Sequence, residues 1–124
     1  MHYNESEENY LETILMLSHK LPVVRSVDIA NELGFKKSSV SIAMKHLREK
    51  EYITVSDAGF IYLTASGQAI ADMVFERHSV ITHCLTLLGV PEETAAEDAC
   101  RIEHVISPES FDAIKAHMNK MKTK

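Results

Sequence analysis

Residues 26–50 read SVDIANELGFKKSSVSIAMKHLREK, and this stretch decides the fold because it holds two helix patterns around one glycine. Apolar residues recur at helical spacing in both halves, namely Ile29, Ala30 and Leu33, then Val40, Met44 and Leu47. Ser26 is placed to cap a short helix over 27–33, and Gly34 follows where helices usually end. A second helix is expected from residue 37 or 38 to residue 50. A short helix, a turn with glycine and a longer helix predict a helix-turn-helix.

The second of these helices is basic on its polar face. Residues 36–50 carry one acid, Glu49, against the basic side chains Lys36, Lys37, Lys45, Arg48 and Lys50, in a chain of formal net charge -5. Small hydroxyl residues at a helix start let backbone N–H groups approach phosphates and base edges. The pattern therefore predicts DNA binding through Lys36, Lys37, Ser38, Ser39, Ser41 and Lys45. Ile42 occupies a position on this helix where a polar side chain could have hydrogen-bonded to bases. Its presence there favours readout of DNA shape.

Two β-branched or aromatic runs, at 52–55 and 60–64, follow directly and enclose the turn Ser56-Asp57-Ala58-Gly59. Such runs around an Asp-x-Gly turn predict a β-hairpin. A hairpin after a helix-turn-helix is a wing, which typically lies along a DNA backbone or in the minor groove. Winged helices also serve as protein-interaction modules, so that alternative stays open, as does a solvated basic helix in an ordinary bundle.

Two further helices flank this motif. The first is expected over 6–19, where Tyr10, Ile14 and Leu17 recur at helical spacing. The other starts at Thr64 or Ser66 and runs to about Leu88, and it is apolar on more than one side. A helix with so much apolar surface must bury part of it elsewhere. A second copy of the chain is the simplest partner, so the pattern predicts a two-fold homodimer.

The stretch Ala99-Cys100-Arg101-Ile102-Glu103-His104 carries chemistry of another kind. A helix from Glu92 or Thr94 to about Val105 would place Cys100, Glu103 and His104 on one face. A thiolate, a carboxylate and an imidazole together are typical of a transition-metal site. Three ligands are too few to close such a site, so other parts of the chain must supply the rest.

The composition fits a small protein of the cytoplasm. The chain has 124 residues, of which 45% are hydrophobic, and two cysteines. No signal peptide or run of membrane-spanning length is present, so we expect no membrane partner and a cytoplasmic location. There a free cysteine is typically a ligand, a redox centre or a core residue. Ser107 and Pro108 predict a last helix over 108–119, and the polar residues from Asn119 onward are expected to fray.

The expected fold class is therefore mainly α. An N-terminal winged helix-turn-helix of three helices and a β-hairpin wing occupies residues 1–64. A helical metal-binding and dimerisation domain occupies residues 65–124. We expect the chain to bind a double-stranded DNA operator as a homodimer.

Several motifs together carry a family resemblance: Glu8-Asn9-Tyr10-Leu11-Glu12-Thr13-Ile14, the helix-turn-helix from Asp28 to Leu47, Leu63-Thr64-x-x-Gly67, Arg77-His78 and Ala99-Cys100-Arg101-x-Glu103-His104-Val105. Over nearly its whole length, the chain resembles the metal-dependent repressors of the diphtheria-toxin-repressor and manganese-transport-regulator type, which include the iron-dependent regulators. The resemblance implies a homodimeric winged-helix repressor that controls metal-ion homeostasis. The chain resembles the short architecture of the family, so we expect it to function without the C-terminal SH3-like domain of longer members.

The resemblance also implies a set of metal ligands: Asn9, Glu12, His78, Cys100, Glu103 and His104. Asn9 stands where iron-type relatives have Met and manganese-type relatives have Asp. Glu12 matches the manganese type and Cys100 the iron type. Thr82 and Ala96 fall where ligands of the iron-type ancillary site would be. Because thiolate favours softer metals and carboxylate harder ones, the mixture favours Fe(II), with Mn(II) second.

Two other classes of function compete with this interpretation. A winged-helix regulator could sense a redox signal or an organic ligand through Cys100. A small metalloenzyme could hold a catalytic Zn(II) with Cys, Glu and His. No nucleophile motif or substrate-binding loop accompanies these residues, and the basic helix would be unexplained, so neither an enzyme nor a small-molecule substrate is expected. A winged helix used only for assembly contacts is the remaining alternative.

Overall fold

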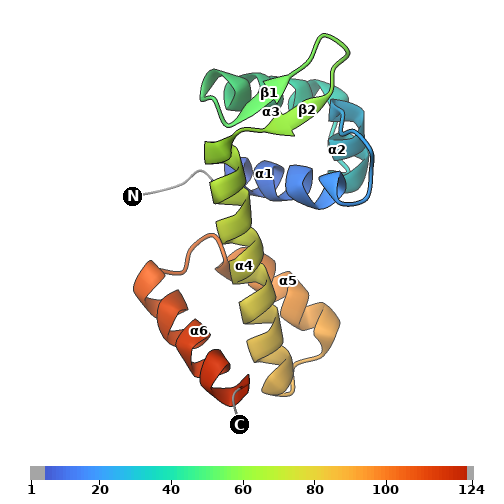
Figure 1. Cartoon of the computed structure of the whole chain (residues 1–124). Coiled ribbons are helices and arrows are strands. Elements are labelled where there is room, and N and C mark those ends of the chain that lie inside the picture. The colour runs from blue at the N-terminus through green and yellow to red at the C-terminus, as the bar shows by residue number, and fades with distance from the viewer. Residues whose placement is uncertain (1–4, 123–124) are drawn as a thin grey trace. The chain divides into compact units, whose positions relative to one another are not determined.

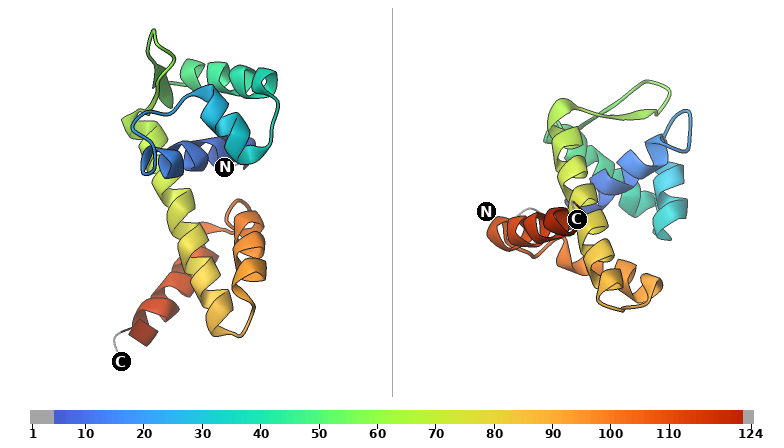
Figure 2. Two further views of the ribbon diagram at one scale, coloured as in Figure 1. Left: turned by 90° about the vertical axis from the view of Figure 1, so that its right-hand side faces the viewer. Right: turned by 60° about the horizontal axis from the view of Figure 1, so that its bottom comes forward.

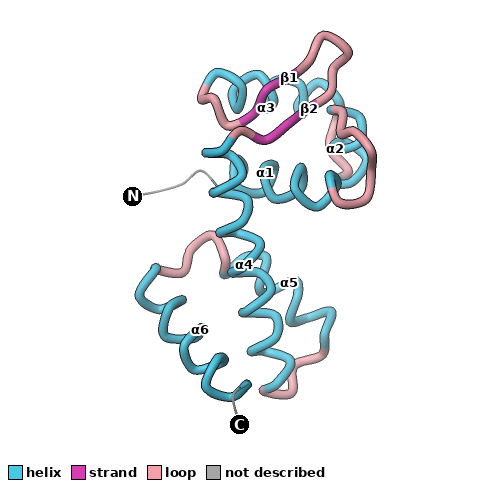
Figure 3. The backbone as a smooth tube through the Cα atoms, viewed as in Figure 1, coloured by secondary structure: helices cyan, strands magenta, loops and turns pink. Residues whose placement is uncertain are grey.

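The structure, a computed structural model, describes residues 5–122 and is mainly helical (Figures 1 and 3). Its elements in chain order are α1 (Glu5–Ser18), α2 (Ser26–Leu33), α3 (Lys37–Glu49), β1 (Ile53–Val55), β2 (Ile61–Leu63), α4 (Ala65–Leu87), α5 (Glu92–Ile102) and α6 (Pro108–Lys122). They form two compact units, which divide between Asp72 and Met73, inside α4. The predicted domain boundary at residues 64 and 65 stays a prediction.

The first unit is a helix-turn-helix packed on α1 and followed by a hairpin. Its core gathers apolar side chains from every element: Leu11, Ile14, Ile29, Val40, Met44, Leu47, Ile53 and Ile61. All three residues of the predicted inner face of α3 are buried there, with exposed fractions of 0% for Val40, 4% for Met44 and 1% for Leu47. The opposite face of α3 is consequently left to solvent, which confirms the amphipathic pattern of this helix.

The ends of α2 differ in part from the prediction. Gly34 has a φ of 70° and ends the helix in the left-handed conformation, as expected. Ser26, however, is the first helical residue and not the cap, because Arg25 takes the N-cap position with extended backbone. The Asp28 carboxylate accepts the N–H of Arg25 at 2.8 Å. Asp28 at the third helical position therefore supplies the half of a capping box that satisfies the N-cap N–H, and among the described residues no serine hydroxyl caps an N–H at this end.

The predicted hairpin is present, with strands shorter than the apolar runs. β1 and β2 pair antiparallel, with Ile53 opposite Leu63 and Val55 opposite Ile61. Beyond this ladder, the Ile61 N–H donates to the carbonyl of Val24 at 2.8 Å, so the segment before α2 adds an isolated bridge. β1 also contacts α3, and the hairpin can be followed from two further sides in Figure 2.

The junction between the wing and α4 explains one of the motif glycines. Thr64 caps α4, because its Oγ1 accepts the N–H of Gly67 at 3.2 Å and donates to the Glu51 carbonyl at 2.7 Å. A Cβ on Gly67 would lie 1.9 Å from the carbonyl oxygen of Tyr52. This position therefore admits only glycine without a backbone shift, because α4 begins directly against the strand entrance.

The second unit contains the rest of α4, α5 and α6. Ile81, Ala99 and Phe111 form its small buried centre. Ser107 caps α6 as predicted, since its Oγ accepts the N–H of Ser110 at 3.1 Å. The expected end of α6 was wrong, because the helix continues through Lys120 and Met121, which are good helix formers, to Lys122. The last two residues of the segment expected to fray, 123 and 124, lie outside the described residues. None of the helices described between residues 5 and 122 is long and apolar enough to cross a membrane.

Candidate metal centre and nucleic-acid interface

The six residues predicted to bind DNA lie together at the start and along the outer face of α3. Lys36 is the N-cap residue, and the other five lie within the first three turns of the helix. All six are exposed: Lys36, Lys37, Ser38, Ser39, Ser41 and Lys45. Because the buried face is on the other side, these hydroxyl and ammonium groups are available to a partner without any loss of core packing.

Lys50 differs from the other basic residues of this segment. Its ammonium Nζ lies 2.6 Å from Oε2 of Glu7 on α1. This hydrogen bond raises the pKa of Lys50 above its usual value against the opposing effect of desolvation, and the charges of Glu7 and Tyr52 raise it further. The charge of Lys50 is thus balanced within the unit, and the unbalanced positive charge is concentrated on Lys36, Lys37, Lys45 and Arg48.

A shallow hollow beside α3 adds two residues to those predicted to bind DNA. It is lined by Ser26, Ser41, Met44, Lys45, Arg48 and Val55. Two hydroxyls, an ammonium and a guanidinium around one concavity suit an anionic oxygen such as that of a phosphate. Arg48 was noted in the sequence only as part of the basic charge, and Ser26 was missed because it comes from another helix and no spacing rule connects it with α3.

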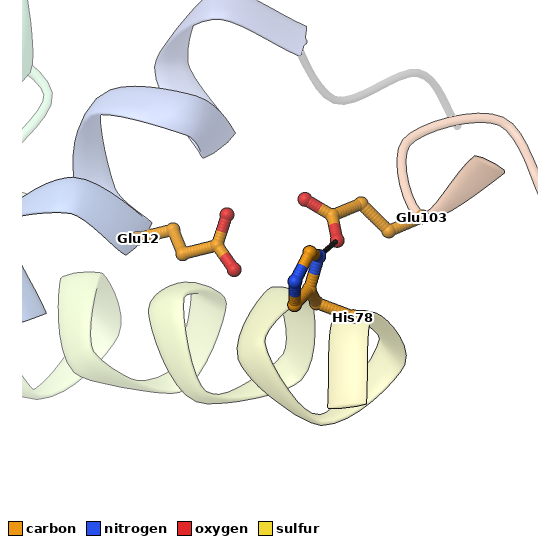
Figure 4. Close-up of side chains that lie close together, drawn as sticks. All are labelled: Glu12, His78 and Glu103. Atoms are coloured by element: carbon orange, nitrogen blue, oxygen red, sulfur yellow. Dashed lines mark hydrogen bonds and ion pairs between the residues drawn. The ribbon is translucent and has the colours of Figure 1, made fainter. Parts of the chain in front are cut away.

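The second unit buries one carboxylate between two imidazoles. Glu103 is 0% exposed. Its Oε2 lies 3.0 Å from Nδ1 of His78 on α4, which Figure 4 shows as a dashed line. Its Oε1 lies 3.4 Å from Nε2 of His104 and, among the described residues, has no hydrogen-bond partner. A buried carboxylate is costly unless it is paired or coordinates a cation, so this oxygen marks a place for positive charge.

Arg77 stabilises the turn that carries Glu103 and His104. One guanidinium nitrogen, Nη1, donates to the carbonyls of Glu103 and Ile106, each at 3.1 Å. The same guanidinium lies over the ring of Phe111, 5.6 Å from its centre. Arg77 therefore satisfies the carbonyl of the C-cap residue Glu103 and a carbonyl of the loop that leads to α6. The sequence showed Arg77 only as a neighbour of His78, and only the fold reveals this role.

The helix carrying the cysteine motif is shorter than predicted. α5 ends at Ile102, so the expectation of a helix through Val105 was wrong. Glu103 is the C-cap residue and His104 lies in the following turn, because the chain must bend there to place Glu103 in the interior. Cys100, in the last turn of α5, is exposed. The structure thus brings His78, Glu103 and His104 together and leaves the Cys100 thiol accessible to solvent.

The remaining two predicted ligands, Asn9 and Glu12, belong to α1 in the first unit. Glu12 is buried, with an exposed fraction of 6%, and Asn9 is partly buried. The backbone carbonyl of Asn9 accepts the hydroxyl of Thr13 at 2.8 Å. Carboxylate, imidazole, amide and thiolate donors are a set that fits a divalent transition metal, and the orphaned oxygen of Glu103 agrees with that fit.

Fold and site together define a winged-helix DNA-binding protein with a helical metal-binding unit. Two family models cover nearly the whole sequence. "Iron dependent repressor, N-terminal DNA binding domain" matches residues 2–59, and "Iron dependent repressor, metal binding and dimerisation domain" matches residues 64–124. The chain belongs to the iron-dependent repressor family, whose members are metal-dependent transcriptional regulators and not enzymes.

Sequence similarity to two transcriptional regulators supports the same family assignment. The chain is 33% identical over 119 residues to the transcriptional regulator MntR of Escherichia coli O6:H1, covering 96% of this chain and 77% of the relative. It is 34% identical over 109 residues to the HTH-type transcriptional regulator MntR of Bacillus subtilis, covering 88% of this chain and 77% of the relative.

Solved structures share the fold. IdeR of T. acidophilum superimposes with a TM-score of 0.78 at 26% identity, covering 90% of this chain. A manganese-dependent transcriptional repressor in complex with manganese gives a TM-score of 0.82 at 23% identity, covering 91% of this chain. The chain spans about half of each of these proteins, 53% and 52% of their lengths.

Proposed function

We propose that the chain represses transcription when a divalent metal binds Asn9, Glu12, His78, Cys100, Glu103 and His104. The observation that carries this proposal is the fully buried Glu103 carboxylate. One oxygen lies 3.0 Å from His78 Nδ1, and the other lies 3.4 Å from His104 Nε2 with no hydrogen-bond partner in the described part of the chain. When bound, a divalent cation supplies the positive charge that such a carboxylate needs in a water-poor interior. The other five residues follow from the family resemblance and from their donor chemistry.

The chain's own residues link this site to DNA binding. Asn9 and Glu12 lie on α1, the helix that packs on α2 in the DNA-binding unit. His78, Cys100, Glu103 and His104 lie in the helical unit. Ligands taken from both units would fix the angle of the winged helix. In a homodimer this angle sets the distance between the two α3 helices, which we place in successive major grooves of a palindromic operator.

The coupling must act in both directions. If metal raises the affinity for the operator, operator DNA must raise the affinity for metal by the same factor. Without metal, no shared ion joins Asn9 and Glu12 to His78, Cys100, Glu103 and His104. The population of binding-competent dimers is then expected to fall.

We favour Fe(II) as the physiological metal, with Mn(II) second. The Cys100 thiolate favours a softer metal than the carboxylates do, and the Asn9 carbonyl is a weak neutral ligand. The exposed position of Cys100 leaves its sulfur reachable from solvent. Because operator DNA is the partner, we place the protein in the cytoplasm.

The test is anaerobic fluorescence anisotropy on palindromic duplexes with Fe(II), Mn(II) or Zn(II) against a chelator. We expect tight binding only with metal, and we expect Cys100→Ala and His104→Ala to abolish it while leaving a folded dimer. His83→Ala is the matched control, because His83 is an exposed histidine of α4 outside the proposed set. Full metal response in either ligand variant would remove that residue from the site. Equal binding with and without metal would leave the cluster a structural or redox role.

A further inference from the structure

The outer face of α3 contains one side chain that does not match its surroundings. Ile42 is 60% exposed. The residues that surround it on the helix surface, three and four positions away, are all polar and exposed: Ser38, Ser39, Lys45 and His46. At about 100° per residue, Ile42 lies about 200° around the helix from the buried Val40. It is thus on the far side from the core and contributes nothing to core packing.

Folding gives no reason for an isoleucine here. A β-branched side chain costs helix propensity relative to alanine or lysine, because its χ1 is restricted against the preceding turn. An exposed apolar side chain also gains no burial energy within the chain. Ile42 would gain burial energy if a partner surface covered it, and its place at the centre of a polar, basic helix face makes that partner the one that the lysines contact.

We propose that Ile42 recognises the 5-methyl group of a thymine in each half of the operator, so that a direct apolar contact accompanies the readout of DNA shape expected from the sequence. The inference rests on the proposed placement of α3 in the major groove. There the thymine methyl is the one apolar feature that a base edge presents, and aliphatic side chains contact it. The lysines and hydroxyls around Ile42 suit phosphates and polar base edges, and Ile42 adds a preference for an apolar group that polar side chains do not supply.

The test begins with selection of binding sites from random duplex DNA by the full chain loaded with Mn(II). Each thymine of the selected sites is then replaced by deoxyuridine, which removes only the methyl group. Each half-site should contain one thymine whose single replacement weakens binding by the unaltered protein about fourfold. This is the effect of about one buried methyl group. Replacement in both halves should weaken binding about fifteenfold.

The Ile42→Ala variant should bind the thymine site more weakly and lose nothing further on the deoxyuridine site. Met16→Ala removes an apolar side chain of α1 that is 41% exposed, and this control should keep the full thymine preference. Sites without thymine dependence, or an Ile42→Ala variant as sensitive to deoxyuridine as the parent, would overturn the inference alone. Failure to select any DNA with metal present would overturn the proposed function with it.

Discussion

The outer face of α3 and the turn after α5 are both rich in ionisable groups, but the two regions differ in how far those groups are exposed to solvent. On α3 the charged side chains are exposed and the helix beneath them is regular. At Glu103 the carboxylate is fully buried and the helix has just ended. Exposed charges act through many small, salt-screened contributions, whereas a buried charge depends on its few direct partners. The first arrangement tolerates substitution and the second does not.

The largest expected effect is at Glu103. Glu103→Gln keeps the shape of the side chain and an oxygen that can accept from His78, but it removes the charge. The parent should gain about 4 kcal/mol of stability when metal is at about a thousand times its dissociation constant. The variant should lose most of this gain. Anaerobic thermal unfolding with and without Mn(II) measures it.

The control for this experiment is Glu97→Gln, an exposed acid on α5 that no proposed ligand set includes. Its metal-induced shift should equal that of the parent. A full metal-induced shift in Glu103→Gln would show that burial of this carboxylate has nothing to do with metal.

A smaller loss is expected at Arg77. Arg77→Ala removes both hydrogen bonds to the turn and leaves the carbonyls of Glu103 and Ile106 unsatisfied, at a cost of about 2–3 kcal/mol. Metal affinity should fall as well, because Glu103 and His104 are no longer held in place. Urea unfolding and calorimetric metal titration measure the two effects. Lys115→Ala, which breaks an exposed ion pair with Glu76, is the control and should change neither.

The same contrast explains which parts of the fold and of the candidate site could be predicted from the sequence. The helix-turn-helix and its wing were predictable because periodicity, Gly34 and the Asp-x-Gly turn are local signals. The predicted inner face of α3 matches the buried residues, and the exposed face needed no knowledge of the fold. The end of α5 was missed because it depends on Arg77, 26 residues before Glu103 in the chain. No local pattern reveals a hydrogen bond across that separation.

The smallest and most graded effects belong to α3. Because each lysine on a phosphate releases a counterion, Lys45→Ala should lower the salt dependence of operator binding by about one in log–log slope per copy of the chain. Lys50→Ala removes the same charge from the same segment, but Lys50 is held by Glu7. Its slope should therefore stay near that of the parent. Anisotropy titrations from low to high salt compare the two variants directly. If both variants lowered the slope equally, α3 would contribute only a diffuse positive field. A specific phosphate contact by Lys45 would instead lower the slope in Lys45→Ala alone, because Lys50 is paired with Glu7.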